Sequence, residues 1–150
     1  MAIVVLATAL LPLPSTLAAE ELKLRDGISF YQDIDSGFPI VAQKLDDVEP
    51  AKGSPTLIFF GAAGDLYTNR QSRRVVDLYR RYRAAGVKFI VIDVDQPGVP
   101  AAKELVREYY RGYIPFEVIL DKSGAKVWSQ IGEVESKQLE TQLDKTLDSK

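Results

Sequence analysis

Residues 113–127 read YIPFEVILDKSGAKV, and they place a proline, an apolar run and a turn in close succession. Residues 116–120 have the length and composition of a strand. The letters DKSG that follow are typical of a hairpin turn, and residues 125–131 have the pattern of a returning strand. The segment therefore predicts an antiparallel hairpin that begins directly after Pro115.

The residues before this hairpin alternate between strand and helix patterns. TLIFF at 56–60 and VKFIVIDV at 87–94 are continuous apolar runs, which are typical of strands covered on both faces. Residues 68–85 between them form an amphipathic helix that Gly86 is well placed to end. The apolar face of this helix consists of Val75, Leu78, Tyr79 and Tyr82.

Two further helices are predicted, over residues 100–110 and 135–147. From residue 56 onward the order is strand, helix, strand, helix, hairpin, helix. The first strand–helix–strand unit requires a parallel pair with a right-handed crossover, and the hairpin adds antiparallel strands. The sequence thus predicts an α/β fold with a central mixed sheet and helices on both faces. Ahead of this core, residues 28–32 form a short β-prone run, and the spacing over 33–48 suits a helix that Pro39 complicates.

The composition excludes several classes of chemistry. The chain has 150 residues, a formal net charge of −2, and neither cysteine nor histidine. Thiol catalysis, disulfides and Fe–S clusters are therefore excluded, and the usual neutral-pH base and commonest metal ligand are missing. We expect no metal, no cofactor and no attraction of nucleic acid by net charge.

The first nineteen residues carry no charged side chain and are nearly all apolar between Ala2 and Leu13. An apolar run followed by small residues is typical of a signal peptide, although no Lys or Arg precedes it. We expect an exported protein, periplasmic or secreted, with 1–19 as a signal peptide or N-terminal anchor. Membrane contact would occur only through that segment if it is uncleaved. Residues 20–55 then form an N-terminal segment and connector, and 56–150 form the core.

Three stretches of the core resemble the thioredoxin-like family. VKFIVIDVDQPG at 87–98 resembles a family strand that ends in an Asp-Gln-Pro-Gly-like turn. The hairpin segment at 113–127 resembles the family's Ile-Pro, apolar strand, Lys-x-Gly turn and return strand. IFFGAAGDLYT at 58–68 occupies the place of the Phe-Trp-Ala-x-Trp-Cys-Gly-Pro-Cys motif. The resemblance implies a thioredoxin-like three-layer sandwich over about residues 56–149.

The resemblance places a degenerate active-site turn at Asp65, Leu66, Tyr67 and Thr68. Asp65 and Thr68 stand where the two cysteines would be. Disulfide exchange requires a thiolate, and a carboxylate cannot replace it, so no catalytic residue is predicted here. The position of Asp65 before a helix instead predicts an N-terminal cap.

The family's other active-site features are also missing. Gly61 and Gly64 replace two tryptophans, Phe59 stands where the family has a buried aspartate, and Val91 stands where a lysine often accompanies it. The sulfurs and the buried charged pair are thus absent together, because a buried acid with no proton to move is only a desolvation cost.

The loop Tyr113, Ile114 and Pro115 is the feature that the resemblance implies is retained. In thioredoxin-like proteins the equivalent proline is cis, and the residue before it pairs with an extended peptide. Ile114 would then offer its N–H and C=O to a client strand, which needs no cysteine. The alternative is that Pro115 only shapes a turn.

The letters GAAGDL at 61–66 also resemble the Gly-Ala-Ser-Gly-Asp-Leu of glucose-6-phosphate dehydrogenases. A strand, a glycine-rich turn and a helix form a dinucleotide phosphate site, and Asp93 or Asp95 would meet the ribose. The alternative function is therefore a nucleotide-binding oxidoreductase. A third interpretation is a thioredoxin-like protein that is classed as redox-related because of its family, although its own residues do not support redox chemistry.

Positive charge concentrates on the helix that follows the turn. This face would dock an acidic protein or an anionic headgroup, or it is simply a solvated helix face. The candidate docking residues are Arg70, Arg73, Arg74, Arg80 and Arg81. The first hypothesis remains a non-catalytic binding module whose partner is a protein or peptide.

Overall fold

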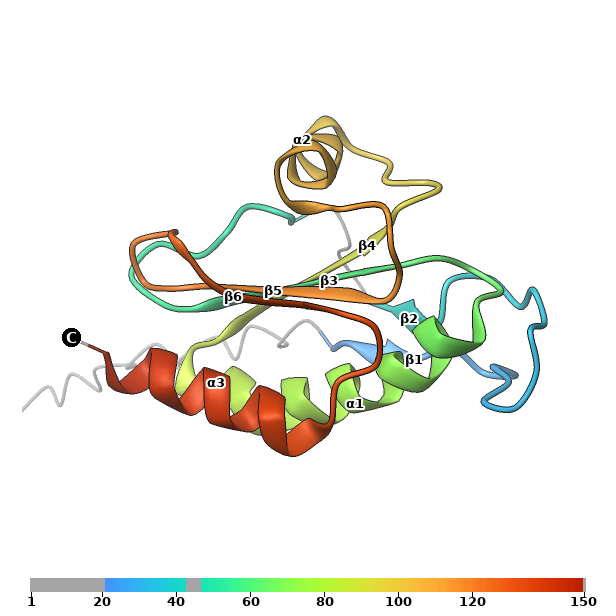
Figure 1. Ribbon diagram of the computed structural model, residues 1–150, viewed down its shortest axis with the longest axis horizontal. Coiled ribbons are helices and arrows are strands. Elements are labelled where there is room, and N and C mark those ends of the chain that lie inside the picture. Colours follow the sequence, from blue (N-terminus) through green and yellow to red (C-terminus); the bar gives the residue numbers. More distant parts are fainter. Residues whose placement is uncertain (1–20, 43–46, 150) are drawn as a thin grey trace, which may run out of the picture.

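The computed structural model describes residues 21–42 and 47–149 (Figure 1). The strands are β1 Lys23–Leu24, β2 Ile40–Val41, β3 Thr56–Gly61, β4 Lys88–Asp93, β5 Phe116–Leu120 and β6 Lys126–Ile131. The helices are α1 Leu66–Tyr82, α2 Pro100–Tyr109 and α3 Ser136–Asp148, and a 3₁₀ turn, Arg83–Ala85, extends α1. From β3 onward, this is the order of elements that the sequence predicts.

The central sheet has the strand order β4-β3-β5-β6. β3 pairs in parallel with β4 and antiparallel with β5, and β5 pairs antiparallel with β6. Every residue of β3 and β5 is buried, as expected for central strands with both faces covered. β6 is mostly exposed and forms one edge of the sheet.

Helices cover both faces of this sheet, so the mixed three-layer arrangement is confirmed (Figure 1). α1 and α3 lie on one face and α2 on the other. Successive side chains of β3 point to opposite faces of the sheet, so the strand contributes to both hydrophobic cores. Phe59 packs with Leu78 and Leu143 on the first face, and Phe60 packs with Leu105 on the second. Within 21–42 and 47–149, no helix is long and apolar enough to cross a membrane.

The prediction of a strand at residues 28–32 is wrong, because this segment is bonded to α1 and not to another strand. The Ser29 hydroxyl accepts the N–H groups of Tyr31 and Gln32, which bends the chain. The helix suggested over 33–48 is also not formed in the described residues 33–42 and 47–48, because Ile40–Val41 is instead β2, paired antiparallel with β1. Leu45, which contributed to that helical spacing, lies outside the described residues.

Candidate functional site

Strand register brings the two predicted site segments together at one end of the sheet. Phe60, near the end of β3, pairs with Phe116 at the start of β5. Gly61 and the turn after it therefore lie beside Pro115 and the loop before it. The Ile114–Pro115 peptide bond is cis, as the resemblance implies. β6 ends at the same place, where the Gly132 N–H donates to the Pro115 carbonyl at 2.8 Å.

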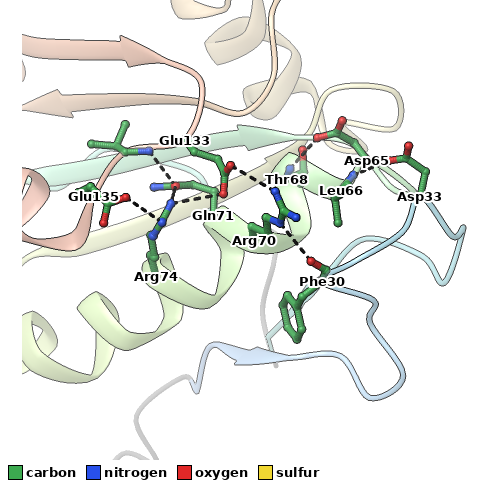
Figure 2. Close-up of polar contacts among 11 residues, drawn as sticks. Phe30, Asp33, Asp65, Leu66, Thr68, Arg70, Gln71, Arg74, Glu133 and Glu135 are labelled. Carbon is green, nitrogen blue, oxygen red and sulfur yellow. Dashed lines mark hydrogen bonds and ion pairs between the residues drawn. The ribbon is translucent and has the colours of Figure 1, made fainter.

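Two carboxylates occupy the N-terminus of α1 (Figure 2). Asp65 is the N-cap, and its Oδ2 accepts the Thr68 N–H at 2.6 Å. Asp33, far away in the sequence, accepts the Leu66 N–H through Oδ1 at 2.9 Å. Both groups satisfy backbone donors that have no partner inside the helix, and negative charge is favoured at this end of the helix dipole. The predicted capping role of Asp65 is confirmed.

The segment 29–35 crosses the outside of this helix start. The Asn69 side chain donates to the Ser29 carbonyl at 2.8 Å, and Arg70 Nε donates to the Phe30 carbonyl at 3.0 Å. Gly64 adopts φ +80°, which favours glycine, and a side chain there would point at the Asp35 backbone. Segment 29–35 thus fixes the conformation of the turn before α1.

Removing the carboxylate cap should weaken the fold measurably. We expect Asp65→Ala to lower the free energy of unfolding by about 1 kcal/mol, because the Thr68 N–H loses its acceptor. Asp65→Asn keeps an acceptor at the same position and should retain most of that stability. Urea unfolding followed by circular dichroism measures both variants, and equal midpoints for Asp65→Ala and the natural chain would contradict the capping role.

The same carboxylates argue against the nucleotide interpretation. A phosphate at the GAAGDL turn would bind the first N–H groups of α1, but Leu66 and Thr68 already donate theirs to Asp33 and Asp65. A bound phosphate would also lie against two negative side chains. The antiparallel neighbour of β3 further separates this sheet from the parallel sheet of dinucleotide-binding folds.

The arginines predicted as a docking face are largely engaged within the chain (Figure 2). Arg74 donates to Gln71 Oε1 at 3.1 Å and to Glu135 at 3.1 Å. Arg73 lies over the Phe30 ring at 5.3 Å. The acidic partners are Glu133 for Arg70 and Arg74, Asp77 for Arg80, and Glu140 for Arg81. These contacts tie α1 to α3 and to the loop after β6, so they favour a structural use of the charges, and docking stays a prediction.

Exposed apolar side chains gather around the site, and they include Tyr67 and Tyr113, which the sequence analysis places in it. Among the described residues, six large apolar side chains are exposed, and five of them lie at this end of the sheet. Only Val127 lies elsewhere on β6. We call the other five the apolar patch: Tyr31 (85% exposed), Ile34 (47%), Tyr67 (54%), Tyr113 (65%) and Ile131 (48%). Large contiguous apolar patches are typical of interaction sites.

The backbone of Ile114, which directly follows Tyr113 of this patch, is unpaired. Neither its N–H nor its C=O makes a hydrogen bond with any residue in 21–42 or 47–149. Its neighbour Pro115 is bonded to Gly132, so the loop is held in place while the Ile114 groups are left open. Such groups require a partner from water or from another chain.

A buried acid lies behind the turn, where the sequence predicted none. Glu117 of β5 is fully buried and pairs in register with Phe59, so both side chains lie on the face covered by α1. Burial raises the pKa of Glu117 to about 8, and Gln71 and Arg74 lower it only in part. Within the described residues, neither carboxyl oxygen of Glu117 completes a hydrogen bond, and Gln71 Nε2 also lacks a partner. A buried carboxyl is thus present on β5, the strand next to Phe59.

Solved structures similar to this chain are thioredoxin-fold proteins. Thioredoxin from Fasciola hepatica is 21% identical with a TM-score of 0.53, and the match covers 63% of this chain and 83% of that one. StoA from Bacillus subtilis is 19% identical with a TM-score of 0.51, over 61% and 84% of the two chains. Thioredoxin-2 of a malaria parasite is 17% identical with a TM-score of 0.55, over 66% and 89%.

These likenesses show the thioredoxin fold, as the sequence predicts. No protein-family model matches the chain, and no curated protein sequence matches it either. The full sequence contains no cysteine, so the chain has no thiol with which to perform thiol–disulfide exchange.

Proposed function

We propose that this thioredoxin-fold chain is an exported, non-catalytic binding module that holds an extended peptide or a partner protein at the Ile114–Pro115 loop and the 65–68 turn. The observation that carries the proposal is the position of Ile114. Its open N–H and C=O lie in a loop that is fixed by neighbouring strands, and Tyr113 of the apolar patch directly precedes it. Backbone pairing supplies affinity in this kind of recognition, and flanking apolar side chains supply contact area.

Tyr67 and Tyr113 are the side chains best placed to flank a bound strand. Tyr67 lies in the first turn of α1 and Tyr113 directly precedes Ile114, and both are more than half exposed. Tyrosine offers a large, rigid and amphipathic surface at low entropic cost, which is why it is common in binding sites. Neither ring is part of the buried cores, so neither is required for folding.

Export and the absence of catalysis complete the proposal. The apolar run at 2–13 supports export, and the missing thiol and imidazole groups support a role without turnover. Asp65 serves as a helix cap, so the acid at the former nucleophile position already has a structural task.

An array of short random-sequence peptides, probed with the full chain, tests the binding site. We expect a subset of peptides to bind, and we expect Tyr67→Ala combined with Tyr113→Ala to reduce that binding by about tenfold or more, since exposed aromatic anchors dominate interface energies. Val127→Ala is the matched control, because it also removes an exposed apolar side chain, but outside the apolar patch.

Thermal unfolding of each variant distinguishes lost binding from lost structure. The double tyrosine variant should melt with the natural chain, since both rings are exposed. Equal loss of binding in Val127→Ala would contradict the proposed site. An array on which the natural chain binds no peptide would overturn the proposed function itself.

A further inference from the structure

A groove runs beside the apolar patch along the edge strand. It has a volume of about 360 Å³, and we call it the basic groove; its lining residues are Arg111, Phe116, Lys126, Ser129, Gln130 and Ile131. It begins next to the loop, because Phe116 follows Pro115 and pairs with Ile131. It extends toward Lys126, which pairs with the last residue of β5 at the far end of β6. An occupant that follows this groove is therefore extended.

The lining carries two cations and no acid. Arg111 donates through Nη1 to the carbonyls of Glu108 and Tyr110, at 3.0 and 3.2 Å, which orients its guanidinium at the end of α2. Neither Arg111 nor Lys126 forms an ion pair with any carboxylate in the part of the chain that the structure describes. Four of the five candidate arginines of α1 do have acidic partners, so most of the charge on that helix is paired, unlike the two cations of the groove.

The groove also has an apolar part. Phe116 is buried and stacks against Phe60 at 5.9 Å between ring centroids, so its position is fixed. Ile131 is 48% exposed and belongs both to the groove and to the apolar patch. One continuous surface thus leads from the open backbone of Ile114, over Ile131, to the two cations.

We propose that the basic groove selects among extended peptides by taking a side-chain carboxylate, from Asp or Glu, next to an apolar residue of the same peptide. This inference rests on the proposed function and names its ligand class. The guanidinium of Arg111 offers a planar set of donors that suits a carboxylate, and Lys126 adds a second positive charge farther along the strand. The peptide strand pairs at Ile114, and its acidic residue lies over the groove.

Peptides tethered through their C-termini test this selection, because only side chains then supply carboxylates. We expect the bound subset to be enriched in Asp and Glu. For the strongest binder, replacing each Asp by Asn and each Glu by Gln should weaken binding by about twofold to fivefold, as expected for solvent-exposed charge pairs. The double variant Arg111→Gln, Lys126→Gln should remove both the enrichment and this difference, while neutral peptides bind it as before.

The control is Lys52→Gln combined with Lys145→Gln, which changes the net charge equally at positions outside the groove. Lys126→Gln alone is the second variant, because Arg111 also contacts α2 carbonyls and its loss could disturb that end of the helix. Binding without acidic enrichment, or equal effects of the two double variants, would overturn this inference and leave the proposed function standing. If the natural chain binds no peptide, both fall.

Discussion

Glu117→Leu is expected to stabilise the protein, and to do so more at pH 8 than at pH 5. The carboxyl of Glu117 is fully buried, and its pKa is raised by burial to about 8. In the unfolded chain the pKa of the same group is near its ordinary value of 4.5. Between these two values the folded state binds the extra proton, so the free energy of unfolding falls as the pH rises.

The size of this effect follows from the width of that window. Each pH unit inside it costs about 1.4 kcal/mol, so from pH 5 to pH 8 this one group lowers the stability of the natural chain by about 3 kcal/mol. Leucine has no proton to hold and fills a similar volume beside Phe59 and Ile119. The difference in the free energy of unfolding between Glu117→Leu and the natural chain should therefore increase by about 3 kcal/mol from pH 5 to pH 8.

Urea unfolding at several pH values measures this difference directly. Glu117→Gln should also remove the pH-dependent part, although its buried amide still requires hydrogen bonds. Glu49→Gln is the control, because it makes the same chemical change at an exposed position. If the free energy of unfolding changes with pH in the same way for Glu117→Leu and the natural chain, the raised pKa of Glu117 is contradicted. The carboxylate would then be ionised in the folded protein, with a partner in the core.

Glu117 also shows where sequence reasoning ended. The run FEVIL was correctly predicted to be a strand, because its length and the DKSG turn after it are local signals. Glu117 is the one acid in that apolar run, and an acid in a buried strand is the sequence signal that could have indicated a polar site in the core. What it faces depends on Gln71 and Arg74, which α1 brings over the sheet from far away in the chain.

The start of α1 illustrates the same limit. Asp65 was identified as a cap from local sequence, yet the helix begins at Leu66, two residues earlier than its periodicity predicted. The second cap, Asp33, has no local signature at all, since it caps a helix that starts 33 residues later. The two-residue strands β1 and β2 were missed for a related reason, because so short a pair depends on packing against α1.

Gly61→Ala is expected to destabilise the fold by about 1 to 3 kcal/mol, the usual cost of overpacking a filled core. Gly61 is the last residue of β3 and is buried. A methyl group there would collide with Thr68 Cγ2 and would lie 3.3 Å from the Phe59 ring. Thr68 cannot easily move, because its hydroxyl accepts the Ala62 N–H at 3.3 Å and its branched side chain is stiff within the helix.

Thr68→Ser provides the matched rescue, since serine lacks Cγ2 but keeps the hydroxyl that Ala62 uses. Alone, it should cost about 1 kcal/mol for one buried methyl group. Combined with Gly61→Ala, it should restore much of the lost stability, so the two changes together cost less than the sum of their separate costs by about 1 kcal/mol or more. Urea unfolding of the four chains gives this coupling energy. Strict additivity would mean that the turn relaxes away from Thr68, so the contact with Thr68 would not be what limits the size of the side chain at position 61.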